Sequence, residues 1–414
     1  MSVHLGVLPG GDKATGSLCN PSLSDAGGDH DSGAFANVSD PAGYIEYLFG
    51  PTSTRWGAVR AQDGHSAPYE PFTIALSNEE GCSPGYQARA IAFMETAATR
   101  ALQLASPPSM LSFALACDGA RFNHWRNDSS THAMTLACAN LTKRYPRVKI
   151  FWDQHVNGDE LDAPVHPTNF SGVFAAERSA TRAWGLEVPV VVLEENGNMH
   201  DLQRALGHAR NALAFQAMGD HVLVQCYANC FQPVCHGQNG DCTAHYSQGG
   251  KMFLPGGPPA PGHSNRTWLS PHGWSTQMLS ASYRPQGLSV DVSGDDPSGP
   301  AGSDIRLHAM ATVDANESSM VVRALNPTGN TIQLTVDVVG SLVPDTTAGV
   351  TVDTLSGATL AADNAWMTPL AVHPVRNSID TSLIMSGNSS ARVLINHTLP
   401  AFSFAVFTVP LMTL

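Results

Sequence analysis

Short apolar runs alternate with helical patterns over the first two-thirds of the chain, and this alternation limits the possible folds more than any other property. Six runs are almost wholly apolar, as expected of strands covered on both faces: residues 3–8, 72–76, 111–117, 148–152, 188–193 and 222–226. Between them, residues 86–104 and 199–218 carry apolar side chains spaced by three or four positions, which predicts amphipathic helices. Strands that alternate with helices predict a parallel α/β sheet or barrel.

From about residue 283 the pattern changes to short stretches in which apolar and polar residues alternate. These stretches are residues 288–292, 305–312, 319–326, 331–339, 350–355, 392–396 and 402–409. Turns rich in Pro, Gly, Asn and Asp separate them, as in the sequence NPTGN at residues 326–330. Such a series of short strands predicts an antiparallel β-sandwich. We therefore expect two domains, residues 1–282 and residues 283–414.

The charge of the chain excludes several classes of partner. Its 414 residues contain 22 Lys and Arg against 35 Asp and Glu, which gives a formal net charge of −13 at pH 7. Only four residues are lysines, so we expect no basic patch that could hold a nucleic-acid backbone. The sequence has no run of about eighteen apolar residues, and we predict no membrane span.

Two features predict a secreted protein. The chain has eight Asn-x-Ser/Thr sequons and eight cysteines, an even number that fits an oxidising compartment. The sequon asparagines are Asn37, Asn127, Asn140, Asn169, Asn265, Asn316, Asn388 and Asn396. Met1 is not followed by the basic and apolar regions of a signal peptide, so we expect an extracellular or secretory-pathway protein whose signal is not in this chain. A cytosolic protein with coincidental sequons and buried thiols is the alternative.

Potential metal ligands gather near residues 226–242, but their spacing fits no zinc site. They are Cys226, Cys230, Cys235, His236 and Cys242. Because no CxxC pair is present, disulfides or packed thiols are favoured over zinc. The pairing of Cys82 and Cys117 cannot be deduced from spacing. The sequence has no phosphate-binding glycine motif, so we predict neither a metal nor a cofactor.

Glutamates directly follow two of the predicted strands. Residues 72–76 run into Glu79, and residues 188–193 run into Glu194 and Glu195. In a parallel barrel, catalytic groups sit at the carboxyl ends of strands, and a pair of carboxylates is what glycoside hydrolysis requires. The alternative is structural, because a glutamate that opens the next helix stabilises the positive end of the helix dipole.

A dense block of residues carries a family resemblance. It reads YIEYLFG at residues 44–50, STRWGAVRAQDGH at residues 53–65, PY at residues 68–69 and SNE at residues 77–79. This block resembles the signature of the α-L-arabinofuranosidases of glycoside hydrolase family 51, which reads roughly YIEF–G–TxWGxxRAxxGHPEPF and then GNE. Further similar blocks follow in the family's order at residues 117–119, 153–155, 193–196, 222–228 and 399–404, so the resemblance covers nearly the whole chain.

The resemblance implies a (β/α)8 barrel followed by a β-sandwich, and a retaining hydrolase that releases terminal α-L-arabinofuranosyl residues from arabinose-containing polysaccharide. It implies that Glu79 is the general acid/base and that Glu195 is the nucleophile, with Glu194 as the alternative. Asn78 would bind the sugar 2-hydroxyl, and His155 would line the site. The remaining candidate substrate-binding residues are Trp56, Tyr227 and Glu194 itself.

Several positions depart from the family pattern. Ser77 replaces a glycine, Asn196 replaces the aromatic residue after the nucleophile, and Val156 and Asn157 stand where aromatic residues are expected. The family has two barrel strands before residues 3–8, so we expect a chain truncated at its N-terminus. Two other functions stay open: hydrolysis of another glycan such as β-glucan or xylan, and a catalytically weak or inactive carbohydrate-binding homologue. The sequence does not predict the oligomeric state.

Overall fold

The structure is a computed structural model, and it divides the chain into two compact units. It describes residues 40–76, 82, 84–117, 129–158, 170–197, 199–227, 231–234, 252–255, 267–294, 307–339, 344–345, 348–365, 368–379, 381–385 and 391–412. The first unit comprises residues 1–156, 169–194 and 220–225, and the second comprises residues 157–168, 195–219 and 226–414. The strand predicted at residues 3–8 lies outside the described residues.

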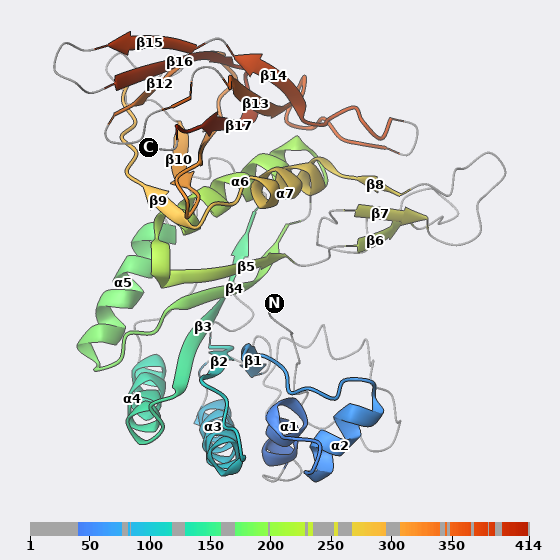
Figure 1. Cartoon of the computed structure of the whole chain (residues 1–414), viewed down its shortest axis with the longest axis vertical. Coiled ribbons are helices and arrows are strands. Elements are labelled where there is room, and N and C mark those ends of the chain that lie inside the picture. Colours follow the sequence, from blue (N-terminus) through green and yellow to red (C-terminus); the bar gives the residue numbers. More distant parts are fainter. Residues whose placement is uncertain are drawn as a thin grey trace. The chain divides into compact units, whose positions relative to one another are not determined.

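A five-stranded sheet forms the first unit, with its strands in the order β1-β2-β3-β4-β5 (Figure 1). The strands are β1 (Thr73–Leu76), β2 (Leu111–Leu115), β3 (Val148–Asn157), β4 (Val190–Asn196) and β5 (Val222–Tyr227), and the last residues of β3, β4 and β5 belong to the second unit. β1, β2 and β3 pair in parallel, with Leu115 opposite both Leu76 and Trp152. Five of the six strands predicted for this region are thus confirmed, because their continuous apolar character reflects burial on both faces.

Helices cover one face of this sheet. They are α1 (Asp40–Phe49), α2 (Arg55–Gln62), α3 (Pro84–Gln103), α4 (Ser129–Arg144) and α5 (Phe170–Ala183). Phe113 of β2 and Trp152 of β3 share a core with Phe93 of α3, whose ring meets Phe113 edge-on at 6.3 Å. Because strand side chains alternate between faces, Asp153 and His155 of β3 point to the opposite face from Trp152.

Within the described residues, the second unit contains two α-helices and three sheets. The helices are α6 (Leu202–Ala217) and α7 (Pro271–Ala281). One antiparallel sheet has the order β14-β13-β17-β11-β10-β9 and a second has the order β12-β16-β15. Their strands are β9 (Gln286–Leu288), β10 (His308–Val313), β11 (Ser319–Asn326), β12 (Ile332–Val338), β13 (Val350–Ser356), β14 (Val375–Ile379), β15 (Thr381–Met385), β16 (Ala391–Leu399) and β17 (Ser403–Pro410). The third sheet contains β6 (Phe231–Val234), β7 (Met252–Pro255) and β8 (Trp268–Leu269).

The central strands of the six-stranded sheet are buried on both faces. On β17, Phe404 and Val406 pack against α6 and α7, whereas Ala405 and Phe407 pack towards Ile395 of the three-stranded sheet. The strict alternation of β17 explains why its pattern predicted a strand so clearly. The fold class predicted from the sequence, a parallel α/β region followed by antiparallel sheets, is confirmed.

Some predicted elements were wrong or missed. The strand expected at residues 288–292 instead ends at Leu288, and β14 and β15 were not predicted at all. β14 is almost fully exposed, so it has no apolar alternation and is held by backbone pairing to β13 and by the ion pair of Arg376 with Asp353 (2.7 Å). An exposed edge strand leaves little hydrophobic signal in a sequence. Among the described helices, none is long and apolar enough to cross a bilayer.

Glu177 of α5 should make stability depend on pH. The side chain is fully buried, neither carboxyl oxygen has a hydrogen-bond partner in the described part of the chain, and burial raises the pKa of this carboxyl well above its usual value. In the folded state Glu177 therefore keeps its proton at pH values where the carboxyl of an unfolded glutamate is already ionised. The contribution of Glu177 to stability is therefore lost as the pH rises above the ordinary pKa of a glutamate. We expect Glu177→Gln to raise the melting temperature relative to wild type, and to raise it more at about pH 8 than at about pH 5.

Thermal melts at both pH values measure this difference. Glu70→Gln changes an exposed carboxyl of the first unit and serves as the matched control, for which no such trend is expected. If the melting temperatures of wild type and Glu177→Gln differed by the same amount at both pH values, the Glu177 carboxyl would not be buried as described.

Candidate active site

The carboxyl ends of β1 and β4 are where the sequence places its candidate carboxylates. β1 ends at Leu76, and the predicted site residues Asn78 and Glu79 lie outside the described residues. β4 contains both Glu194 and Glu195. Functional groups on parallel strands gather at this edge of the sheet, so it is the natural place to look for a site.

A histidine stands between two acidic side chains on β3 and β4. His155 Nε2 lies 3.5 Å from Asp153 Oδ2, and His155 Nδ1 lies 3.7 Å from Glu194 Oε2. Asp153 also accepts a hydrogen bond from the Leu193 amide (3.1 Å), which fixes β3 to β4. The His155 side chain is 1% exposed and that of Glu194 is 23% exposed, so Glu194 is the member of this group that solvent can reach.

Glu195 sits in a different setting, inside the second unit. Arg204 Nη1 donates to Glu195 Oε1 (3.2 Å), and His208 Nδ1 lies 3.1 Å from Glu195 Oε2. Arg204 Nη2 also donates to the Glu195 carbonyl (3.3 Å). All three side chains are 0–1% exposed. The guanidinium of Arg204 therefore stands as a buried counter-charge beside the Glu195 carboxyl.

The helix that follows β4 supplies both partners of Glu195. Asp201 caps α6 and accepts from the Arg204 amide (3.2 Å), which fixes the first turn of the helix. Arg204 and His208 are four residues apart, so they lie on one face of α6 and can hold the same carboxylate. Gly158 closes this group, because a Cβ there would come within 2.1 Å of Glu195 Oε1 and 1.7 Å of Arg204 Nη1.

Tyr227 at the end of β5 belongs to the same group as Glu195. Its ring meets the His208 ring edge-on, with the ring centroids 4.2 Å apart. The ring centroid of His272 of α7 lies 4.7 Å from that of His208 and 5.5 Å from that of Tyr227. The structure thus brings two predicted site residues together through His208. Sequence reasoning missed Arg204, His208 and His272. The four-residue spacing of two basic side chains on the helix after the glutamates was the available signal for the first two.

The two neighbouring glutamates point to opposite faces of β4. Glu194 meets His155 on β3, whereas Glu195 meets α6, as the alternation of side chains along a strand requires. In the structure, Glu194 shares the face of Asp153 and His155.

Trp56 lies in α2 and contacts α1. Its amide donates to Glu46 Oε1 (2.8 Å), and its indole ring lies against Gly43 in the first turn of α1. The side chain of Trp56 is 38% exposed, and its role in sugar binding stays a prediction.

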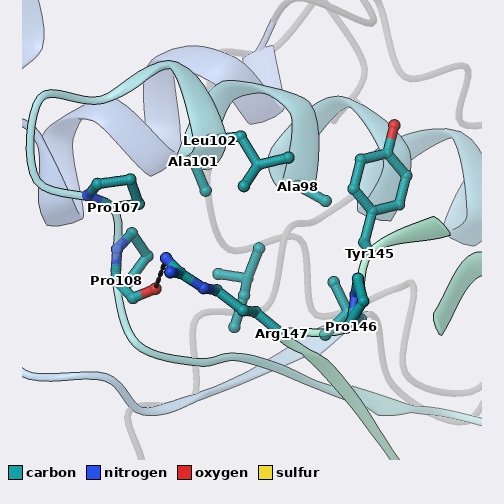
Figure 2. Close-up of a pocket in the computed structure, with 10 residues that line it drawn as sticks. Ala98, Ala101, Leu102, Pro107, Pro108, Tyr145, Pro146 and Arg147 are labelled. Atoms are coloured by element: carbon teal, nitrogen blue, oxygen red, sulfur yellow. Dashed lines mark hydrogen bonds between the residues drawn. The ribbon is translucent and has the colours of Figure 1, made fainter. Parts of the chain in front are cut away.

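A cavity of about 290 Å³ lies at the amino-terminal edge of the parallel sheet (Figure 2). It is lined by the starts of β2 and β3, by the last turns of α3, and by Pro107, Pro108, Tyr145, Pro146 and Arg147. Arg147 donates to the Pro108 carbonyl (3.4 Å) across it. Its place at the amino ends of the strands separates this apolar cavity from the candidate site.

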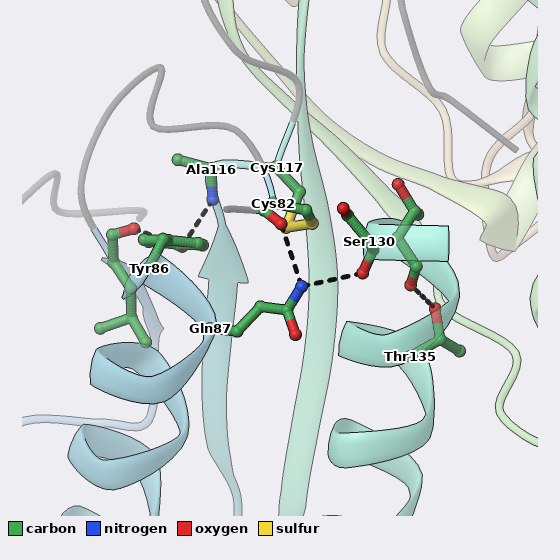
Figure 3. Close-up of a disulfide and its surroundings, with 9 residues drawn as sticks. Cys82, Tyr86, Gln87, Ala116, Cys117, Ser130 and Thr135 are labelled. Atoms are coloured by element: carbon green, nitrogen blue, oxygen red, sulfur yellow. Dashed lines mark hydrogen bonds between the residues drawn. A yellow bond between two sulfur atoms is a disulfide. The ribbon is translucent and has the colours of Figure 1, made fainter. Parts of the chain in front are cut away.

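A disulfide joins Cys82 to Cys117, which settles the pairing that the sequence left open (Figure 3). Of the cysteine and histidine group at residues 226–242, only Cys226 is among the described residues. In the described ranges, no three or more His, Cys, Asp or Glu side chains are arranged to hold a metal ion.

Replacing Arg204 should destabilise the protein. We expect Arg204→Met to cost about 3–5 kcal/mol of unfolding free energy, because the buried Glu195 carboxylate loses its permanent counter-charge. Urea unfolding of wild type, Arg204→Met, Glu195→Gln and the double variant measures this cost. The double variant leaves no unpaired charge and should recover most of the loss. A cost below about 1 kcal/mol, which is typical of exposed pairs, would contradict a buried ion pair.

Comparisons with known proteins point in one direction. Residues 23–151 match the sequence model of the Alpha-L-arabinofuranosidase 1 domain, and no curated protein matches the chain in sequence. The fold is similar to that of an α-L-arabinofuranosidase from Thermotoga maritima, solved as an arabinose complex, with a TM-score of 0.61 and 14% identity over 91% of this chain and 74% of that one. The family 51 α-L-arabinofuranosidases from Thermotoga petrophila RKU-1 and Bifidobacterium longum give the same values. The resemblance to the α-L-arabinofuranosidases of glycoside hydrolase family 51 is therefore confirmed, by sequence over residues 23–151 and by fold over most of the chain.

Proposed function

We propose that this chain is a retaining glycoside hydrolase that releases terminal α-L-arabinofuranosyl residues from arabinose-containing polysaccharides or oligosaccharides. The observation that carries the proposal is the presence of glutamates at or just after the carboxyl ends of two strands of one parallel sheet, in a fold similar to that of arabinofuranosidases. As part of this proposal, residues 1–282 form the catalytic barrel domain and residues 283–414 form a β-sandwich.

The proposed reaction has two steps. Glu79 protonates the departing glycosidic oxygen while a β4 glutamate attacks the anomeric carbon, which breaks the glycosidic bond and forms an arabinosyl ester. Glu79 then takes a proton from water, and the water oxygen replaces the carboxylate, which releases arabinose with retained configuration. The two carboxyl groups must come within about 5–5.5 Å of each other for this route. Asn78, next to Glu79 in the chain, is proposed to bind the sugar 2-hydroxyl.

Two adjacent glutamates compete for the role of nucleophile. The family pattern assigns it to Glu195, whose carboxyl group has Arg204 as a buried counter-charge and His208 as a neighbour. Glu194 has the better access, because its side chain is 23% exposed and lies beside His155. We retain Glu195 as the proposed nucleophile and Glu194 as the named alternative. His155 and Tyr227 are proposed to line the site, each next to one of these glutamates.

A second candidate function is a carbohydrate-binding homologue with little or no catalysis. The enclosure of Glu195 by Arg204, His208 and Gly158 favours it, because a nucleophile needs an oxygen that can reach the sugar. Hydrolysis of a β-glucan or xylan instead of an arabinan would keep the chemistry and change only the glycan.

Kinetics of alanine variants test the proposal. On an aryl arabinofuranoside, Glu79→Ala should lower kcat/KM by about 10²–10⁴-fold, the usual contribution of a general acid/base, and the nucleophile variant should lose at least as much. Added azide should rescue both, with retention in Glu79→Ala and inversion in the nucleophile variant, because azide then enters from opposite faces of the sugar. Glu80→Ala is the matched control and should keep wild-type activity.

The outcomes separate the candidates. If azide rescues Glu194→Ala and gives a product of inverted configuration, and Glu195→Ala shows no such rescue, the nucleophile is Glu194. If wild type and all glutamate variants are equally slow on arabinofuranosides, xylosides and glucosides, the hydrolase proposal fails. Binding to arabinan without turnover would then support the second candidate.

We also propose that the protein is secreted and glycosylated. The sequon asparagines in the described part of the chain, Asn140, Asn316 and Asn396, are all exposed, and the Cys82–Cys117 disulfide fits an oxidising compartment. Chain expressed through a eukaryotic secretory pathway should lose mass when peptide N-glycosidase removes its glycans. A mass equal to that of the bare chain before treatment would contradict glycosylation.

A further inference from the structure

The apolar cavity at the amino ends of β2 and β3 has the size of a small ligand. Its volume is about 290 Å³. Along one wall, Ala98, Ala101 and Leu102 of α3 face the cavity at the spacing of successive helical turns (Figure 2). Leu111 and Val148, the first residues of β2 and β3, also line it. An apolar group that enters this cavity is therefore removed from water.

Two connections complete the walls and keep the cavity open. The loop after α3 contributes two prolines and the turn between α4 and β3 contributes a third, and proline restricts the backbone. The Leu111 amide donates to the Arg147 carbonyl (3.0 Å), and the Val148 amide donates to the Tyr145 carbonyl (2.9 Å). Because these bonds tie both connections to the strands, the cavity is preformed, and a ligand loses little affinity to the ordering of loops.

Arg147 supplies a positive charge at the rim of the cavity. Its side chain is exposed and extends across the cavity towards Pro108, opposite the residues of α3 (Figure 2). Its hydrogen bond to the Pro108 carbonyl is long, at 3.4 Å. Within the described ranges Arg147 has no acidic partner, whereas the nearby Arg144 is paired with Glu95. None of the ten residues that line the cavity is acidic, so the protein leaves this charge unneutralised.

The walls and the charge together define the chemistry of a ligand. A guanidinium binds a carboxylate through two parallel N–H···O bonds, and apolar walls favour a body without hydroxyl groups. An apolar cavity of about 150 Å³ holds benzene, so a cavity about twice as large takes a ring with a short side chain, or a short alkyl chain. A neutral sugar fits poorly, because its hydroxyl groups need partners that these walls do not offer.

We propose that this cavity binds an organic monocarboxylate with an apolar body of about eight to ten carbon atoms, held by the Arg147 guanidinium. The inference goes beyond the proposed function, since no residue of the cavity belongs to the candidate active site.

Methyl NMR spectroscopy of the full chain measures binding residue by residue. Phenylpropanoate is titrated into protein labelled at its Ala, Leu and Val methyl groups, and octanoate is the second acid, which distinguishes a ring from a chain. We expect the tighter-binding acid to have a Kd of about 1–5 mM, as is usual for a ligand of this size. It should shift the methyl signals of Ala98, Ala101, Leu102, Leu111 and Val148, and leave those of the antiparallel sheets unchanged.

The neutral amide phenylpropanamide, which has the shape of the first acid, isolates the contribution of charge. In wild type the acid should bind about three- to tenfold more tightly than the amide. In Arg147→Gln this preference should vanish, while the affinity for the amide changes by less than about twofold. Lys149→Gln removes an equal charge from an exposed residue that does not line the cavity, so this matched control should keep the preference.

Leu102→Ala tests the apolar wall. The Leu102 side chain is 56% exposed, so its truncation should leave the fold intact. We expect this variant to bind the acid and the amide about two- to fivefold more weakly, because both ligands lose apolar contact, and to keep the preference for the acid.

Three results would overturn the proposal. The first is the absence of shifts in the lining methyl signals at acid concentrations about tenfold above the expected Kd. The second is equal binding of the acid and the amide to wild type. The third is a change in these signals with protein concentration alone, since a second copy of the chain would then cover the cavity. Each result concerns binding and not hydrolysis, so each can be told apart from a failure of the proposed function.

Discussion

The alternation of side chains along buried strands is the constraint on which this structure depends. On β3, Trp152 enters the core beneath the helices, whereas Asp153 and His155 face the other way. On β17, the same alternation sends Phe404 towards α6 and α7, and Phe407 towards the three-stranded sheet. Each strand therefore packs a core with one set of residues and leaves the other set for a second core or a polar group.

Alternation also gives two adjacent glutamates different chemical settings. Glu194 shares a face with His155 and keeps some exposure, whereas Glu195 is enclosed and neutralised by Arg204 and His208. A buried carboxylate is tolerable only because the first turns of α6 bring both of its partners to it. A buried counter-charge and solvent exposure are thus divided between two neighbouring side chains of β4.

The block that carries the family resemblance largely builds a framework. Arg60 is fully buried and donates to the carbonyl groups of Tyr47 (2.6 Å), His65 (3.0 Å) and Ser66 (3.1 Å), so it fixes the turn after α2. Burial acts to raise the pKa of Glu46, but hydrogen bonds from the Trp56 amide and the Arg100 side chain outweigh it and hold the pKa below its usual value. A motif can therefore identify a family through residues that support the fold and do not touch a substrate.

The sequence by itself determined the parallel strands, the amphipathic helices and the antiparallel region, because burial imposes periods of two and of three to four residues that can be read without coordinates. It also determined that glutamates lie at or just after the carboxyl ends of two strands. It could not predict β14, because an exposed edge strand has no apolar period. It could not predict the partners of Glu195, because an ion pair joins residues on different elements. Only the tertiary structure decided that Cys82 pairs with Cys117, that Glu194 lies beside His155 and that Glu195 lies beside Arg204, since these pairings depend on which neighbours the folded chain brings within a few ångströms.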